Sequence, residues 1–415
     1  MAEPNLKRIK RDILRLADMT SKKEAGFTRI SFSDQDRMAR EYIGDLMERE
    51  AGLKVRIDPA GNLIGRRKGK KAGPGILLGS HLDTVSGGGR FDGIAGVIAG
   101  LEVARMFEKT EKETRHPLEV VVFLAEEPSP FGLSTIGSRA MAGKLSEDLL
   151  GALHDDKGTS LGQAILKMGG DPSKIHEAKR TPDDVLSFLE LHVEQGPLLY
   201  SHGEIIGIVT GISAIYRGEV TVCGSFDHAG TTPMNVRKDA LAAASEAILG
   251  LEKICLNIPG VVGTTGRMTV IPNAINVVPG SVSLKLDLRS TSVSKAEEAV
   301  HQFEEVLEHI RQKRAMDIQS KIEISSNPIM FDNGMIGCIR DACKSLNIPY
   351  REMASGAGHD TSHMAEIGPS GMVFIPSRDG KSHCAEEWSE FEHICLGTKV
   401  LAKAIDFIDH EEVCR

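Results

Sequence analysis

Five side chains of the types that bind divalent cations are dispersed along this chain, namely His81, Asp92, Glu127, His192 and His383. Most of them come at or just after the end of a predicted strand. Two cations held about 3.5–4 Å apart need a bridging carboxylate, two or more imidazoles and a terminal carboxylate, which together leave room for a bridging water. Asp92 is the natural bridge. The set therefore predicts the chemistry of a two-metal hydrolase.

Two further acids accompany these candidates. Asp83 lies two residues after His81 and is placed to accept the second ring N–H of that imidazole, which would fix its tautomer. Glu126 directly precedes Glu127 after an apolar run, where two adjacent carboxylates are costly unless a cation neutralises one of them. With Glu127 on the metal, Glu126 is expected to take a proton from the attacking water and to give it to the leaving nitrogen.

Each of these residues also has a purely structural interpretation. Asp92 could serve only as a helix cap, and Glu126 and Glu127 could be solvated loop residues. His192 or His383, taken alone, could be a hydrogen-bonded structural imidazole. We interpret them as one site because they occur together in the same chain.

A second group of polar residues comes later in the chain and consists of His228, Asn276 and Arg289. An imidazole, an amide and a guanidinium suit an oxyanion donor and a fork for a substrate carboxylate, although each could also be a turn or solvated residue. A glycine-rich run could present backbone N–H groups to an anion, or form a plain helix-start loop. It contains Gly356, Ala357 and Gly358.

The metal-ligand candidates need strands whose ends meet. Residues 75–80, 118–125 and 188–193 are short apolar runs typical of buried parallel strands, and residues 93–107 have apolar positions at helical spacing. In an open α/β sheet, ligands gather beyond the carboxyl ends of the strands. The candidate ligands occupy that position.

A different pattern begins at residue 211. Strands and helices alternate there in the order β-α-β-β-α-β, which is typical of a ferredoxin-like domain. The strands are expected at 217–223, 264–270, 281–289 and 321–326, and the helices at 236–254 and 294–314. The segment that follows is expected to supply a helix at 332–345, a strand at 371–375 and a closing helix at 394–408.

We therefore expect an α/β protein of two domains. Residues 1–210 and 327–415 would form a catalytic, dinuclear-metal domain with a central, mostly parallel sheet. Residues 211–326 would form the inserted ferredoxin-like α+β domain. A chain of 415 residues is long enough for two such cores.

Composition limits the classes of binding partner and the cellular compartment that we expect for this protein. The formal net charge of −8 and a pI near 6.0 argue against nucleic acid and acidic membranes as partners, and favour a small substrate. Seven cysteines without C-x-x-C spacing, and a start that lacks the pattern of a signal peptide, predict reduced thiols in the cytoplasm. No apolar run reaches the ~20 residues needed to span a bilayer.

These motifs resemble those of the M20 metallopeptidase clan, and within it the amidases of the hydantoinase and carbamoylase group. The resemblance covers nearly the whole chain and is carried by eight blocks in order. They are GSHLDTVSGGGRFDG (79–93), AEEPSPFGLSTIGSRAMAG (125–143), LELHVEQGP (189–197), FDHAGTTPM (226–234), NAINVVPG (273–280), LDLRS (286–290), SGAGHDT (355–361) and KSHCAEE (381–387).

The resemblance implies two divalent metal ions per subunit, which could be zinc, manganese, cobalt or nickel. It implies a homodimer whose inserted domain mediates association or acts as a lid, with His228 reaching the active site of the partner. It assigns Glu126 as the acid and base, places Asn276 and Arg289 on a substrate carboxylate, and adds Gln195 to the pocket.

Within the group, the GSRAMAG and SHLDTV blocks are more similar to N-carbamoyl-L-amino-acid hydrolases than to allantoate amidohydrolases. The implied reaction cleaves the linear C–N bond of an N-carbamoyl or related ureido acid to amino acid, carbon dioxide and ammonia. EEPSPF, Cys384 and Tyr200 depart from the group and bear on the substrate side chain. The alternatives are an allantoate amidohydrolase or β-ureidopropionase, an M20 aminoacylase or dipeptidase, and a non-catalytic binding protein.

Overall fold

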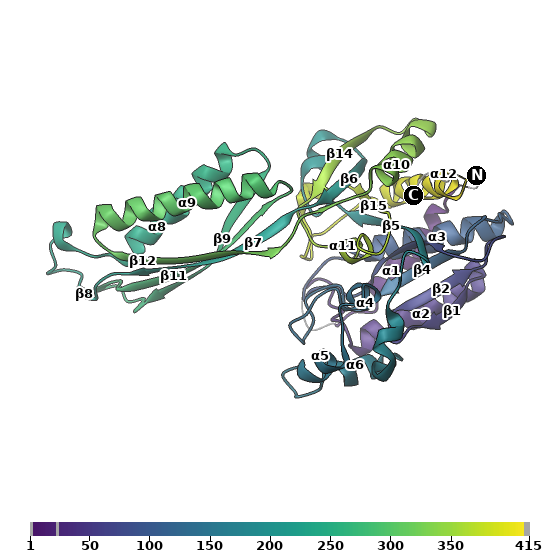
Figure 1. Ribbon diagram of the computed structural model, residues 1–415, viewed down its shortest axis with the longest axis horizontal. Helices are drawn as coiled ribbons and strands as arrows, with labels where there is room; N and C mark the ends of the chain where they lie inside the picture. Colours follow the sequence, from purple (N-terminus) through teal and green to yellow (C-terminus); the bar gives the residue numbers. More distant parts are fainter. Residues whose placement is uncertain (1–2, 22–24, 411–415) are drawn as a thin grey trace. The chain divides into compact units, whose positions relative to one another are not determined.

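The computed structural model describes residues 3–21 and 25–410 (Figure 1). The chain forms two compact units, a larger one of residues 1–210 and 331–415 and a smaller one of residues 211–330. The sequence predicts that the chain returns from the smaller to the larger unit at residues 326–327, four residues earlier than in the structure. The difference comes from a short strand, β13, which pairs with β6 just before the chain enters the larger unit.

A mixed nine-stranded sheet forms the centre of the larger unit. Its order is β1-β2-β4-β3-β5-β15-β6-β13, and β14 also pairs with β6. The four central strands, β4, β3, β5 and β15, are parallel, whereas β1 with β2, β2 with β4, β15 with β6 and β6 with β13 pair in antiparallel fashion. The strands are β1 (Lys54–Ile57), β2 (Leu63–Arg67), β3 (Gly75–His81), β4 (Leu118–Phe123), β5 (Val185–Val193), β6 (Ile206–Ile212), β13 (Ile329–Met330), β14 (Tyr350–Ser355) and β15 (Ser370–Ile375).

Helices cover both faces of this sheet, which explains why its central strands are apolar on both sides. Alternate residues of β3 show the two layers. Leu78 lies under Gly100 of α3, and Leu77 belongs to a buried cluster with Met141 of α4 and Met364 of α11. The helices are α1 (Leu6–Ala17), α2 (Asp34–Ala51), α3 (Ile94–Lys109), α4 (Ile136–Met141), α5 (Glu147–Ala152), α6 (Leu161–Lys167), α7 (Leu198–His202), α10 (Asn333–Ser345), α11 (Thr361–Met364) and α12 (Phe391–His410), with 3-10 turns η1 (Pro172–Ala178) and η3 (Arg378–Gly380).

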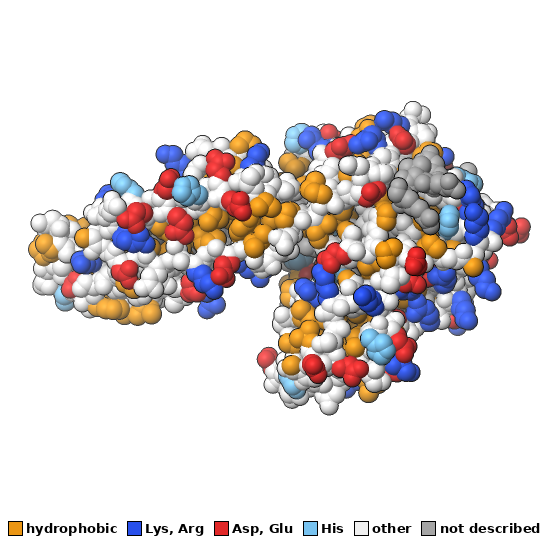
Figure 2. Space-filling view, viewed as in Figure 1, with side chains coloured by type: hydrophobic (Ala, Val, Ile, Leu, Met, Phe, Trp, Pro, Cys, Tyr) orange, Lys and Arg blue, Asp and Glu red, His pale blue; other side chains and the backbone are white. Residues whose placement is uncertain are grey.

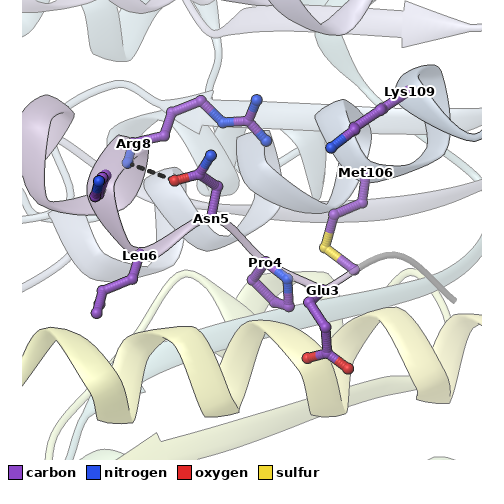
Figure 3. Close-up of a pocket in the computed structure, with 8 residues that line it drawn as sticks. Glu3, Pro4, Asn5, Leu6, Arg8, Met106 and Lys109 are labelled. Carbon is purple, nitrogen blue, oxygen red and sulfur yellow. Dashed lines mark hydrogen bonds between the residues drawn. The ribbon is translucent and has the colours of Figure 1, made fainter.

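Side chains at the helix ends satisfy backbone groups that the helices leave open. The Asn5 side chain accepts a hydrogen bond from the Arg8 backbone N–H at the start of α1, beside a surface hollow that Met106 and Lys109 also line (Figure 3). Helix α6 begins with a capping box between Ser160 and Gln163. These local contacts set where the helices begin.

The smaller unit contains a four-stranded antiparallel sheet in the order β12-β7-β11-β9. Along the chain its main elements have the expected order β-α-β-β-α-β, and both helices pack on the sheet through a mostly aliphatic core. The elements are β7 (Ala214–Cys223), β8 (Asp227–His228), η2 (Met234–Val236), α8 (Ala240–Asn257), β9 (Val261–Ile271), β10 (Val277–Val278), β11 (Ser281–Ser290), α9 (Val293–Arg314) and β12 (Asp317–Ser326).

Two further sequence expectations concern thiols and membranes. The described cysteines form no disulfide with one another, whereas Cys414 lies outside the described residues. Within the described part of the chain, no helix combines the length and apolar character needed to cross a membrane.

Candidate metal centre

The parallel strands bring the candidate ligands together at one edge of the larger sheet. His81 is the last residue of β3, and His192 is the penultimate residue of the neighbouring strand β5. Glu127 follows β4, on the other side of β3, and Asp92 precedes α3. His383 comes from the loop before α12. Because parallel strands end at the same edge, residues far apart in sequence become neighbours.

Asp92 lies at the centre of this group. Its Oδ1 atom is 3.5 Å from Nε2 of His81 and 3.2 Å from Nε2 of His192. Its Oδ2 atom is 3.3 Å from Nε2 of His383, which is also 3.2 Å from Oε1 of Glu127. The residues thus form two triads that could each hold a cation, and Asp92 belongs to both. This geometry is the one expected for a bridging carboxylate.

Backbone carbonyls orient two of the imidazoles. Nδ1 of His81 lies 3.0 Å from the backbone oxygen of Asp83, and Nδ1 of His192 lies 2.9 Å from the backbone oxygen of Val193. If each Nδ1 carries the proton and donates it there, each Nε2 lone pair is directed toward Asp92. The sequence assigned the role of acceptor to the Asp83 carboxylate, but that group is 3.6 Å from Nδ1 of His81.

The Asp83 carboxylate instead holds the two glutamates. Its Oδ1 and Oδ2 atoms accept hydrogen bonds from the backbone N–H groups of Glu126, at 3.2 Å, and Glu127, at 3.0 Å. This corrects the role that the sequence assigned to the carboxylate. Asp83 fixes the turn after β4, so that both glutamate side chains start from a defined backbone position.

Glu126 faces the cluster. Its Oε2 atom is 3.7 Å from Nε2 of His81, and its side chain is 12% exposed. Burial raises the pKa of Glu126 well above its usual value; the imidazole of His81 opposes this change and the carboxylate of Glu127 reinforces it. A carboxyl group with a raised pKa is suited to accept a proton and to return it near neutral pH.

The electrostatics of the cluster fit bound cations. Hydrogen bonds to Asp92 and Glu127 raise the pKa of His383 to about 11, although burial opposes this effect. At His81, burial lowers the pKa, but nearby carboxylates led by Glu126 outweigh it and leave the pKa well above its usual value. The surrounding carboxylates therefore favour the protonated, positively charged form of these imidazoles. Bound divalent cations would supply the positive charge in place of those protons.

Gln195, which the resemblance adds to the pocket, contacts two of the ligand candidates. Its Nε2 atom donates to Oδ2 of Asp92 at 2.6 Å and lies 3.2 Å from Nε2 of His383. Its backbone N–H donates to Oγ of Ser377, and its φ of 59° belongs to the left-handed region. This strained backbone turns the amide back toward the cluster.

The loop at 356–358 lies beside a buried histidine that the sequence analysis did not single out. The N–H of Ala357 already donates to Oγ of Ser355, so it is engaged within the loop. His359, two residues further on, is buried with its ring 4.5 Å from that of His192, and burial lowers its pKa well below the usual value. A neutral His359 thus packs directly behind a ligand candidate.

A third possible metal-binding triad joins Glu190 and His359 to His192. Both carboxylate oxygens of Glu190 are already engaged, because Oε1 accepts from Oγ of Ser80 at 2.7 Å and Oε2 accepts from Thr361. Glu190 therefore supports the strand that carries His192. The two triads that share Asp92 are the better candidates.

The three polar candidates of the smaller unit, His228, Asn276 and Arg289, lie at two separate places. Strands β8 and β10 pair His228 with Val277, and the N–H of Ala229 donates to the backbone oxygen of Asn276, so His228 and Asn276 are neighbours. Arg289 lies near the far end of β11, where it pairs with Asp287. Eight residues of strand, about 27 Å, separate Arg289 from the end of β11 that faces β7 near Cys223.

The three residues that the sequence groups by their chemistry therefore do not form one cluster within a chain. Strand β11 runs the full length of the sheet, with the β8–β10 hairpin connected at one end and Arg289 near the other. Within a single chain, His228 and Arg289 cannot hold the same small molecule.

Comparisons with known proteins agree in sequence and in structure. A profile described as peptidase family M20/M25/M40 matches residues 77–406. An N-carbamoyl-L-amino-acid amidohydrolase from a Pseudomonas species is 37% identical over 403 residues, which cover 96% of this chain and 97% of that protein. An allantoate amidohydrolase from Bacillus subtilis is 32% identical and covers 93% of each chain. A solved amidase of the hydantoinase/carbamoylase family from Burkholderia multivorans is 32% identical, with a TM-score of 0.91 over 99% of each chain.

Proposed function

This chain belongs to peptidase family M20/M25/M40, and from that premise we propose that it hydrolyses N-carbamoyl-L-amino acids. The bond cleaved joins the carbamoyl carbon to the amino nitrogen, and the products are the amino acid, carbon dioxide and ammonia. One observation carries the proposal. Three imidazoles, those of His81, His192 and His383, converge on the two carboxylate oxygens of Asp92. Glu127 contacts His383, and Glu126 lies beside His81.

Two triads would hold the metal ions of this enzyme. His81, Asp92 and His192 would bind one divalent cation, and Asp92, Glu127 and His383 would bind the other. When bound, two such cations polarise a carbonyl oxygen and increase the acidity of water. Imidazole and carboxylate ligands suit zinc, manganese, cobalt and nickel.

Glu126 would move the proton. The attacking water gives a proton to the Glu126 carboxylate while the water oxygen bonds to the carbamoyl carbon. The C–N bond then breaks, and Glu126 returns the proton to the amino nitrogen that leaves. The other product, carbamate, decomposes to carbon dioxide and ammonia. The raised pKa of Glu126 supports this role because the group must bind and release a proton in each cycle.

The smaller unit would complete the site in a homodimer. His228 and Asn276 of one subunit would reach the partner's site, where His228 would donate a hydrogen bond to the substrate carbonyl oxygen and Asn276, together with Arg289 of the other subunit, would hold the substrate carboxylate. The separation of His228 from Arg289 within one chain supports this division between subunits. The smaller unit would thus serve as the dimerisation domain and as a lid over the substrate.

Exposed apolar side chains support an interface on this unit. Several flank His228 and Asn276 in the sequence, and hydrophobic groups are visible on the surface of the unit (Figure 2). They include Phe226, Met234, Val236, Ile271 and Ile275. Strand β9 also lies at an edge of the four-stranded sheet, where unpaired backbone groups can pair with another chain.

A panel of substrates tests the proposed function. The purified protein, supplemented with zinc, manganese, cobalt or nickel, is assayed with N-carbamoyl-L-amino acids and their D-enantiomers, allantoate, β-ureidopropionate and N-acetyl amino acids. We expect ammonia and free L-amino acid from the first set. Hydrolysis confined to N-acetyl amino acids would overturn the proposal in favour of an aminoacylase.

Allantoate is the second candidate substrate because the Bacillus subtilis relative with that activity in its name matches 93% of the chain. Both substrates carry a ureido group and a carboxylate, so the same catalytic groups would serve. A kcat/KM for allantoate that exceeds the value for every N-carbamoyl amino acid would favour this candidate.

A further inference from the structure

A buried glutamate that the catalytic scheme does not use links the two loops that carry Asp92 and His383. Glu387 lies four residues after His383 and is 2% exposed. Its Oε1 atom accepts hydrogen bonds from the backbone N–H groups of Phe91, at 2.8 Å, and Asp92, at 3.1 Å. One carboxylate oxygen thus holds the turn that presents Asp92.

The other carboxylate oxygen of Glu387 holds its own loop. Oε2 lies 2.7 Å from Oγ of Ser382, and the same hydroxyl lies 2.9 Å from Oδ2 of Asp92. Ser382 is the residue before His383 and is 290 residues from Asp92 in the sequence. The hydroxyl therefore bridges the Asp92 and Glu387 carboxylates at the point where the two loops meet.

The lack of a side chain at Gly89 makes room for the Glu387 carboxylate. A Cβ atom added to Gly89 would lie 1.9 Å from Oε1 of Glu387. The backbone of Gly89 is not in the left-handed region, so a side chain there is excluded by this contact and not by its φ angle. The third glycine of the G-G-G run thus admits the carboxylate to the backbone of Phe91 and Asp92.

Aromatic packing holds the same two loops beside the carboxylate. The rings of Phe91 and Trp388 lie 5.3 Å apart, and the guanidinium of Arg90 lies 5.4 Å from the Trp388 ring. Trp388 is the only tryptophan of the chain and directly follows Glu387. Its fluorescence therefore reports on the junction of the two loops.

We propose that Glu387 is a positioning residue that sets Asp92 and His383 at the spacing needed to share one cation. No strand pairing joins the two loops, so polar side chains connect them, and the Glu387 carboxylate with the Ser382 hydroxyl provides the connection to the backbone at Asp92. This inference rests on the proposed function, because it assumes that Asp92, Glu127 and His383 hold a metal ion. Supporting groups of this kind typically change metal affinity by about 10–100-fold when they are removed.

The test measures zinc affinity in the full-length protein. Zinc is titrated against a competing chelator, and bound zinc is followed by mass spectrometry and by Trp388 fluorescence. We expect Glu387→Ala to weaken zinc binding about 10–100-fold. Glu387→Gln should recover part of the loss, since its carbonyl oxygen can still accept from Phe91 and Asp92. Glu386→Ala is the matched control, because Glu386 is an exposed neighbouring acid.

A positioning role has a signature that a loss of folding does not have. At saturating zinc, kcat and KM of Glu387→Ala should return close to wild-type values, and its Tm without zinc should stay near that of Glu386→Ala. Gly89→Ala, which displaces the Glu387 carboxylate while the residue is kept, should weaken zinc binding in the same way. It provides the test if Glu387→Ala does not fold.

Wild-type zinc affinity in folded Glu387→Ala and Gly89→Ala would overturn the inference. So would a loss of bound zinc that only follows the loss of folded protein. If the wild type binds zinc but hydrolyses no substrate of the panel, the proposed function fails while the positioning role stands. A wild-type protein that binds none of zinc, manganese, cobalt and nickel would overturn both.

Discussion

At the scale of single residues, the site depends on backbone turns that few amino acids adopt readily. Ala125, Gln195 and His383 have φ angles of 53°, 59° and 57°. Non-glycine residues in this region are strained by about 1–3 kcal/mol and persist where the surrounding structure holds them. Each turn lies beside or within the cluster around Asp92, so strain and proposed function occur together. The turns direct side chains back toward one point.

Glu126 is the residue on which the proposed chemistry depends most directly. Glu126→Gln keeps the size of the side chain but removes its basicity, so we expect both metals to stay bound and kcat to fall by about 10²–10⁴-fold. Metal content and steady-state kinetics check this prediction. Glu366→Gln, at an exposed position, is the control for loss of a carboxylate. Near-normal turnover in Glu126→Gln would refute the assigned role.

His363 gives a prediction about acid stability. It is buried with its Nε2 atom 3.0 Å from Oγ1 of Thr135; burial, together with Arg139 and Lys144, lowers its pKa to about 3. A lowered pKa in the folded state means that the neutral form stabilises the fold above pH 6.5. This stability is lost as the pH falls toward 3.

We therefore expect the free energy of unfolding to fall by about 2 kcal/mol from this group between pH 7 and pH 5. Urea unfolding at both pH values measures it. His363→Gln should show a smaller loss between the two values, and His301→Gln, at an exposed position, should match the wild type. An equal loss in all three proteins would contradict the assignment.

At the scale of elements, the close approach of α3 to the central strands sets the position of Asp92. A Cβ atom on Gly96 would lie 2.3 Å from the backbone oxygen of Leu191 and 2.7 Å from Cβ of Ser80. The helix can therefore pack directly on β3 and β5 only because this residue is glycine. Since Asp92 comes just before α3, a displaced helix would also displace the bridging carboxylate.

We expect Gly96→Ala to lower the free energy of unfolding by about 1–3 kcal/mol through overpacking. Gly337→Ala is the matched control within helix α10, where an added Cβ meets no atom within 4 Å. That substitution should raise stability by roughly 0.5–1 kcal/mol, because alanine loses less entropy in a helix. Urea unfolding of the two variants tests the contrast, and destabilisation of both would point to a general effect of substituting helical glycines.

At the scale of the whole molecule, the proposed function predicts an active site built from two chains. His228 lies beside one end of the smaller sheet and Arg289 lies near the other, so one substrate can meet both only if they come from different subunits. Closed two-fold assembly places the same surface of each chain against its copy. It would create two equivalent shared sites.

Mixed dimers test this arrangement. Glu126→Gln and His228→Ala are each expected to be inactive, or nearly so, when expressed alone. Co-expressed, they should recover about a quarter of wild-type activity, because half of randomly assorted dimers are hybrids and each hybrid has one intact site. Light scattering verifies the dimer. No recovery in verified hybrids would show that His228 acts within its own chain or not at all.

Much of the fold follows from patterns that are local in the sequence. The apolar runs at β3, β4 and β5 and the alternation in β11 predict strands because buried faces need apolar residues at fixed spacing. The short edge strand β1 and its neighbour β2 were not predicted. They are brief, and β1 is mostly exposed, so their apolar signal is weak.

The sequence by itself determined the ligand types, their order and their place after apolar strands, since these depend only on side-chain chemistry and local periodicity. Only the tertiary structure decided which atoms meet. In the structure, Nδ1 of His81 contacts the backbone oxygen of Asp83 and not its carboxylate, and Glu387 binds the turn at Asp92. The structure also separates His228 from Arg289. Such contacts join residues as far as 296 positions apart, and they depend on how strands and loops pack in three dimensions.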